Sequence, residues 1–172
     1  MGNTVFKNTA KKLRKLNENV VCGFAGSAAD CLTLMELLEK EMERYPGQTL
    51  RACLSLAQQW RTSKAYSQLS ADLIVSDSKM TILLDGQGNC IEIEDGVTAI
   101  GSGGLYATAA ARGMLDDERL SAEEVARKSM KIAADLCLYT NDNFTCEILE
   151  SEVVRDSDKP VLGYWNTRGK GH

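Results

Sequence analysis

The stretch VVCGFAGSAAD, residues 20–30, changes from a strand pattern to a helix pattern within a few positions. The β-branched and apolar residues from Val20 to Phe24 predict a buried strand, which ends at Ala25-Gly26-Ser27. Ser27 with Asp30 three positions later resembles a capping box, so we expect a helix to begin there. The stretch therefore predicts a buried strand that is followed directly by a helix.

The regions on either side add more elements of both kinds. Pro46-Gly47 ends the first helix, and the apolar period then predicts a second helix. The expected helices cover 27–45, 49–66, 105–115 and 121–138, and the expected strands cover 12–16, 20–24, 71–75, 80–84, 90–93, 97–101 and 144–149. Strand and helix runs are segregated, which favours an α+β fold. Two helix pairs flanking two sheets would form a four-layer αββα sandwich.

Length and charge exclude several classes of protein. The chain has 172 residues, with 20 Lys+Arg against 24 Asp+Glu and a net charge of −4. This length predicts one domain with a substantial core. The excess of acidic residues argues against a nucleic-acid partner, and the apolar runs are too short to cross a membrane.

The histidine and cysteine content restricts the chemistry. The one histidine is the last residue, His172, so a Ser-His-Asp or Cys-His mechanism is a poor fit. An enzyme of this composition would use a lysine, a carboxylate or an amino terminus as its base. The six cysteines include no Cys-x-x-Cys pair, and we expect them to be reduced and mostly buried.

Two glycine-containing turns are candidate sites, and each has a structural alternative. Gly101-Ser102-Gly103-Gly104 precedes a helix whose first amides could bind an anion, or it is simply a tight turn. Gly26 could donate its amide to an oxyanion, or it packs closely beside a helix cap. Lys12 could lower the pKa of a nucleophile, but the residues alone do not distinguish it from Lys11 or other surface lysines.

Six stretches taken together resemble one family in their order along the chain. They are GNTVFKNTAKKLRKL, GFAGSAADCLTLMELLE, LAQQWRT, DGQGN, AIGSGGLYATAAARGML and LSAEEVARKSMKIAADLCLYTN. Over residues 2–150 the chain is similar to the HslV (ClpQ) peptidase family, the proteasome-like partners of the HslU ATPase. The resemblance implies the N-terminal-nucleophile hydrolase fold, with two stacked antiparallel sheets between helix layers.

The resemblance also implies an activity and an assembly. Two stacked hexameric rings of identical subunits would enclose a chamber in which unfolded proteins are cleaved. A hexameric AAA+ ATPase, which uses the ATP, would thread substrates into that chamber. The nucleophile would be the hydroxyl of an amino-terminal threonine whose own α-amine acts as the base, which agrees with a mechanism free of histidine.

Site residues follow from the matching positions of the family. Lys12 matches the lysine that tunes the threonine, Ser102 the serine near its amine, and Gly26 the oxyanion-hole amide. Phe24 and Ala28 would lie near the specificity pocket.

A cation site is implied in the same way. Ala134, Cys137 and Thr140 match positions whose backbone carbonyls bind a monovalent cation, usually sodium. The family commonly has glycine at the position of Ala134, and a carbonyl ligand tolerates that difference.

The two ends of the chain depart from the family pattern. The family begins with a Thr-Thr dipeptide and a later Gly-Asp stretch, and both lie upstream of the GNTV motif, so we expect residues 1–150 to be a peptidase domain without its first strands and nucleophile. Thr4 is too close to Lys12 to replace that nucleophile. Residues 151–172 are an unassigned extension.

Three alternatives follow. The chain is a truncated form of a threonine peptidase, an inactive ring subunit of the same assembly, or a monomeric anion-binding protein that uses the Gly101–Gly104 turn. The resemblance implies the cytoplasm for a bacterial protein and the mitochondrial matrix for a eukaryotic one.

Overall fold

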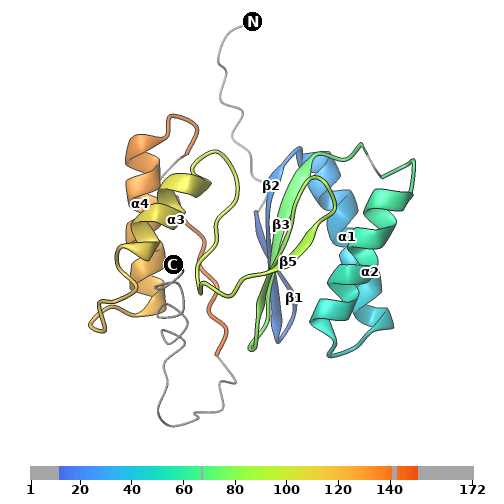
Figure 1. Cartoon of the computed structure of the whole chain (residues 1–172), viewed down its shortest axis with the longest axis horizontal. Helices are drawn as coiled ribbons and strands as arrows, with labels where there is room; N and C mark the ends of the chain where they lie inside the picture. Colours follow the sequence, from blue (N-terminus) through green and yellow to red (C-terminus); the bar gives the residue numbers. More distant parts are fainter. Residues whose placement is uncertain (1–11, 67, 141–142, 151–172) are drawn as a thin grey trace, which may run out of the picture.

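One antiparallel sheet forms the centre of the computed structural model, which describes residues 12–66, 68–140 and 143–150. Its five strands lie in sequence order, each pairing with the next. They are β1 (Leu13–Asn17), β2 (Val20–Gly26), β3 (Ala71–Ser76), β4 (Thr81–Leu84) and β5 (Cys90–Glu92). The sheet is therefore a meander with one long insertion between β2 and β3 (Figure 1).

That insertion forms two helices, α1 (Ala28–Arg44) and α2 (Thr49–Thr62), which cover one face of the sheet (Figure 1). Every second strand residue points toward these helices. In β2 these residues include Cys22 and Phe24, and each is paired with a residue of β3 that points the same way. The helices contribute Leu34, Leu38 and Trp60, whose side chains are almost wholly buried. This face carries the main hydrophobic core, and its burial supplies most of the stabilisation of this part of the chain.

A second helix pair lies on the other side of the sheet, α3 (Gly104–Arg112) and α4 (Ala122–Leu136) (Figure 1). The alanines of α3 let the two helices pack closely, with Ala107 and Ala111 buried. The capping box expected at Ser121 is confirmed, because its hydroxyl accepts from the Glu124 amide and the Glu124 carboxylate accepts from the Ser121 amide.

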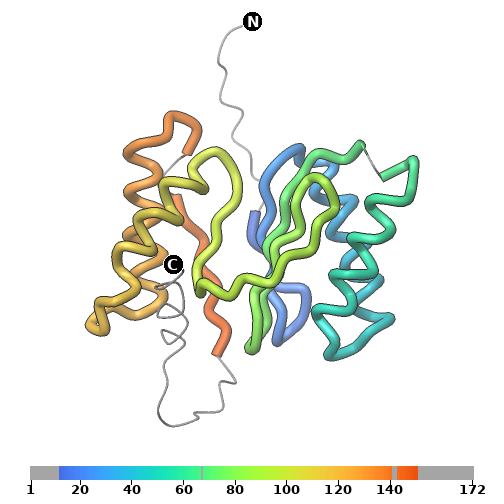
Figure 2. Tube along the Cα trace, in the orientation of Figure 1, coloured from blue at the N-terminus to red at the C-terminus, as the bar shows by residue number. Residues whose placement is uncertain are grey.

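Two expected strands do not form in the described residues. The segments 97–101 and 143–150 have no ladder partner there, although both run between the sheet and the second helix pair (Figure 2). A strand is defined by pairing with a neighbour, and the described part of the chain offers these segments none. The helix layers and one sheet of the expected sandwich are present, whereas its second sheet is not among the described residues.

Other boundaries differ by a few residues. The helix expected to reach residue 66 ends at Thr62, and the one expected over 105–115 is Gly104–Arg112. None of the helices in the described ranges is long and apolar enough to cross a membrane. The extension at 151–172, together with Thr4, Lys11 and His172, lies outside the described residues.

Candidate active site

The turn from β2 into α1 is held against the start of β3. Gly26 pairs with Ala71, and the Ser27 amide donates to the Ser70 carbonyl at 3.1 Å. Gly26 has a φ of +126°, and a Cβ at this position would stand 2.5 Å from the Ser70 carbonyl oxygen. Only glycine fits both the conformation and the close approach.

Asp30 fixes this turn from the helix side. Its Oδ2 accepts from the Ser70 amide at 3.0 Å, while the Ser27 side chain makes no capping hydrogen bond. The capping box expected at Ser27 and Asp30 is therefore wrong. The carboxylate instead links α1 to the residue before β3. The backbone of Ser70 is therefore held at both polar groups, because its amide donates to Asp30 and its carbonyl accepts from the Ser27 amide.

The second turn, residues 101–104, leads into α3 and contacts Thr140 in the segment that follows α4. A Cβ on Gly103 would stand 2.5 Å from the Thr140 hydroxyl oxygen, so a side chain at this position would displace the α4 end. The Thr140 hydroxyl is also the largest cause lowering the pKa of the Cys137 thiol, and the Ser102 hydroxyl acts in the same direction. The Ser102 hydroxyl therefore lies close to Cys137, a residue more than thirty positions away in the sequence.

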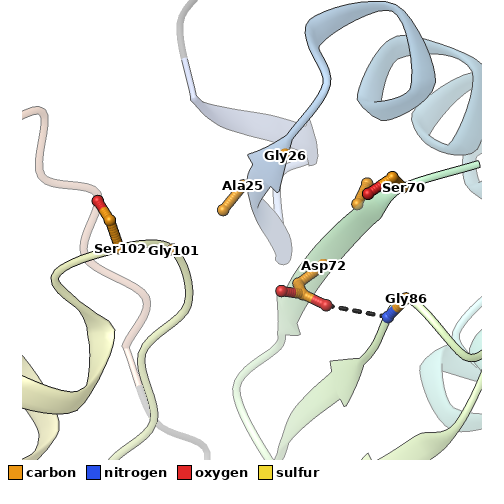
Figure 3. Close-up of a pocket in the computed structure, with 8 residues that line it drawn as sticks. Ala25, Gly26, Ser70, Asp72, Gly86, Gly101 and Ser102 are labelled. Carbon is orange, nitrogen blue, oxygen red and sulfur yellow. Dashed lines mark hydrogen bonds between the residues drawn. The ribbon is translucent and has the colours of Figure 1, made fainter. Parts of the chain in front are cut away.

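Both turns line one cavity of about 280 Å³. Gly26 lies on one side and Gly101 and Ser102 on the other, and Figure 3 shows the Ser102 side chain across the cavity from the sheet. The beginning of β3 contributes Asp72, and the turn after β4 contributes Gly86. An amide at Gly26 and a hydroxyl at Ser102 around one space are suited to hold a reacting carbonyl and a nearby amine.

Two comparisons with known proteins agree with this geometry. The family model for proteasome subunits matches residues 1–149. The crystal structure of eukaryotic HslV from Trypanosoma brucei matches with a TM-score of 0.78 and 48% sequence identity, over 81% of this chain and 80% of that one. The chain belongs to the proteasome family.

Membership of the proteasome family confirms the α+β N-terminal-nucleophile hydrolase fold and the likeness to HslV. The sandwich expected from the element order is therefore the fold of the family. Its second sheet is the part that the described residues do not form.

The other residues that the HslV resemblance implies lie around the Gly26 turn. Lys12 directly precedes β1, and its carbonyl accepts from the Phe24 amide at 2.9 Å. Phe24 itself is 7% exposed and belongs to the core between the sheet and α1. Ala28 is the exposed first residue of α1. Lys12 and Phe24 are thus hydrogen-bonded neighbours and Ala28 follows the Gly26 turn, but none of the three is among the residues that line the cavity. Their catalytic and specificity roles stay predictions.

The carbonyls expected to bind a cation lie at the end of α4. Ala134 is in its last turn, Cys137 is its C-cap, and the Cys137 carbonyl accepts from the Thr140 amide at 3.0 Å. Carbonyls at a helix C-terminus lack partners within the helix and carry partial negative charge, so these residues fit a hard monovalent cation. No cluster of His, Cys, Asp or Glu side chains in the described ranges could hold a metal ion, and the sodium site stays a prediction.

Three residues at this cavity were not predicted as site residues from the sequence: Ser70, Asp72 and Gly86. The only available signal was the position of Asp72 in an otherwise apolar strand pattern, where alternation places it on the same face as Ile74. Ser70 contributes through its backbone, which no motif describes.

Proposed function

We propose that this chain is the proteolytic subunit of an ATP-dependent protease of the HslUV type. The observation that carries the proposal is the meeting of Gly26 and Ser102 at one cavity, at the positions that the HslV resemblance assigns to the oxyanion amide and the amine-binding serine. The substrates are unfolded proteins, and the ATP is consumed by a partner AAA+ ATPase.

The reaction follows from an amino-terminal threonine placed at this cavity. Its hydroxyl attacks the peptide carbonyl while its α-amine takes the proton, and an α-amine titrates near neutrality. The Gly26 amide holds the developing oxyanion, Ser102 orients the amine, and the Lys12 ammonium favours ionisation of the hydroxyl. Ala28 borders the substrate side chain, whereas Phe24, which is buried in the core, supports β2 beneath that position. Sodium, when bound by Ala134, Cys137 and Thr140, would hold the α4 end that contacts Ser102.

The threonine is a separate element of the proposal. No Thr-Thr dipeptide occurs among the 172 residues, so the nucleophile would come from coding sequence upstream of the GNTV motif. If no such threonine exists, the alternative is an inactive ring subunit of the same assembly.

Self-association is supported by exposed apolar side chains around the second helix pair. Leu105 is 86% exposed, Leu138 is 89% exposed and Tyr139 is 84% exposed. Large apolar groups that gather on a surface mark interaction sites. They are consistent with the two stacked hexameric rings that the family resemblance implies.

A pair of lysine variants tests the chemistry. The subunit is expressed with its upstream coding sequence, and hydrolysis of a fluorogenic peptide is followed in the presence of the ATPase. Lys12→Ala should lower kcat by about a hundredfold or more, as expected for loss of a group that activates the nucleophile. Lys15→Ala, in the strand β1 that directly follows Lys12, is the matched control and should retain activity. Equal activity of the two variants would contradict the assigned role of Lys12.

A further inference from the structure

We propose that Asp30 is a positioning residue for peptide-bond hydrolysis, which keeps the Gly26 amide aimed at the oxyanion. This inference rests on the proposed function, because it assigns a further role within the same reaction. Asp30 lies in the first turn of α1 and is not among the residues that line the cavity. It would therefore act through the backbone that carries Gly26, and not through contact with the substrate.

The pairing of the strands decides which way the Gly26 amide points. Backbone amides alternate between the two edges of a strand, and the Phe24 amide is directed toward β1, where it donates to the Lys12 carbonyl at 2.9 Å. The Gly26 amide, two positions later, faces the same edge. The Ser27 amide faces β3 instead and donates to the Ser70 carbonyl at 3.1 Å. The Gly26 amide is therefore directed away from β3, toward the edge on which the Lys12 backbone lies.

The Ser70 carbonyl sets the angle of the backbone at Gly26. Gly26 has a φ of +126°, and a Cβ at this position would stand 2.5 Å from the Ser70 carbonyl oxygen. The two backbones are thus in direct contact, with no side chain between them to absorb a movement. A shift of the Ser70 carbonyl would also pull on the Ser27 amide that donates to it. The direction of the Gly26 amide therefore depends on how firmly the Ser70 backbone is held.

Asp30 holds the other polar group of the Ser70 backbone. Its Oδ2 accepts from the Ser70 amide at 3.0 Å, across 40 positions of the sequence. This bond ties the segment that enters β3 to the first turn of the helix that follows Gly26. A charged acceptor makes a stronger hydrogen bond than a neutral one. Asp30 thus anchors the backbone against which Gly26 is placed.

The test measures kcat and KM for a fluorogenic peptide on the subunit expressed with its upstream coding sequence, together with the ATPase. Loss of a complete oxyanion donor lowers kcat by about a hundred- to a thousandfold, and a donor that is present but free to turn keeps part of that effect. Asp30→Ala should lower kcat about tenfold and change KM less than about twofold, because the Gly26 amide acts on the transition state. An unchanged kcat in Asp30→Ala would overturn the proposal.

Two matched variants separate the hydrogen bond from the charge. Asp30→Asn removes the charge from the start of α1 but keeps an oxygen for the Ser70 amide, so its kcat should stay within about threefold of wild type. Glu36→Ala removes an exposed carboxylate from the same helix and should change neither parameter. Equal losses in Asp30→Ala and Asp30→Asn would assign the effect to the charge and would overturn the proposal.

A peptide aldehyde gives a readout that a smaller folded fraction does not change. The threonine hydroxyl adds to the aldehyde carbon while its proton passes to the α-amine, and the new oxyanion lies where the Gly26 amide binds it. The corresponding peptide alcohol forms no such adduct. Asp30→Ala should weaken inhibition by the aldehyde about tenfold and inhibition by the alcohol less than about twofold. Equal weakening of both inhibitors would mean that Asp30 shapes the general binding surface, which contradicts the positioning role.

Failure of the proposed function is recognised separately, because it appears as a wild-type subunit that cleaves no peptide. In that case, hydrogen exchange of the backbone amides still reports on the link between Asp30 and Ser70. Asp30→Ala should speed exchange at Ser27 and Ser70 relative to wild type and Asp30→Asn, while Val75 in the buried part of β3 stays protected. Faster exchange at both serines supports the link, and equal exchange in the three proteins overturns it.

Discussion

The two faces of the sheet differ in how completely they are covered. On the face toward α1 and α2, side chains such as Leu73, Val75 and Ile82 are wholly buried. On the opposite face, Ile74 and Leu83 are half-buried and Ile91 is 45% exposed. One face therefore has a closed core made by the described residues, whereas the other carries the candidate site and is only partly covered by them.

This difference shows how stability and function are divided in the molecule. The closed face uses helices inserted between neighbouring strands, so the contacts of its core are all made between residues 16 and 90. The open face brings together turns from distant parts of the sequence, and the segments 97–101 and 143–150 approach it without pairing partners. Strand pairing from residues outside the described part would cover it, as the two-sheet family fold requires.

The largest expected effect is on the closed core. Trp60 is 1% exposed, and Trp60→Ala should lower the free energy of unfolding by about 3–5 kcal/mol because it leaves a large cavity. Ile74→Ala on the open face should cost only about 1–2 kcal/mol, because less of its surface is buried. Urea unfolding of both variants measures the difference, and equal losses would show that the two faces are equally covered.

A smaller effect is expected at the turn that joins the two faces. Gly26→Ala should cost about 2 kcal/mol or more, because the new methyl group overlaps the Ser70 carbonyl and the positive φ is strained. Gly47→Ala is the matched control, with a φ of +70° and no atom within 4 Å of the added Cβ. It should cost about 1 kcal/mol from the backbone conformation alone. Equal costs in thermal unfolding would exclude the close approach as the reason for Gly26.

The pKa values of the cysteine thiols differ between the two regions. Burial raises the pKa of the Cys22 thiol to about 12 and also raises the pKa of Cys53, both in the closed core. In the unfolded chain these thiols lose their protons near pH 8.5. Above that pH the unfolded state binds fewer protons than the native state, so the free energy of unfolding falls as pH rises, by up to about 1.4 kcal/mol per pH unit for each thiol.

Urea unfolding between pH 7 and pH 10.5 measures this loss. A double Cys22→Ala, Cys53→Ala variant should show a flatter pH dependence, and an unchanged slope would contradict the assignment. In the native protein, alkylation at neutral pH should modify Cys137, whose pKa is lowered, before Cys22. Modification of Cys22 first would show that the closed core opens readily.

The smallest effect compares the helix starts of the two regions. Ser121→Ala removes the capping box of α4 and should cost about 1 kcal/mol. Ser27→Ala should lower the free energy of unfolding by only a few tenths of that amount, because the Ser27 side chain makes no capping hydrogen bond. Thermal unfolding followed by circular dichroism separates the two, and a larger loss for Ser27 would contradict the hydrogen-bond pattern described for α1.

These helix starts also show which features the sequence could predict. Ser121 and Glu124 are close in sequence, so their capping box was predicted and is confirmed. Ser27 and Asp30 have the same spacing, but Asp30 binds the Ser70 amide, 40 positions away. A contact between residues so far apart in the sequence can replace a local capping hydrogen bond, and the local sequence pattern does not reveal it.

The same argument applies to the strands and the site. Each strand that pairs with a sequence neighbour was predicted, from Leu13 to Glu92, because the hairpin supplies its partner. The segments 97–101 and 144–149 have the composition of strands but depend on partners elsewhere. Gly26 and Ser102 were found through the family resemblance, and Asp72 was missed because only the sheet register brings it to the cavity.

The most direct test of the central claim is ATP-dependent degradation of an unfolded protein such as casein. The subunit is produced with its upstream coding sequence and combined with an HslU-type ATPase. The account predicts degradation that requires ATP, is lost when the amino-terminal threonine is replaced by alanine, and is carried out by a dodecamer-sized complex. A dodecamer of the threonine-containing subunit that binds the ATPase but leaves casein intact would contradict the account and identify a non-catalytic ring subunit.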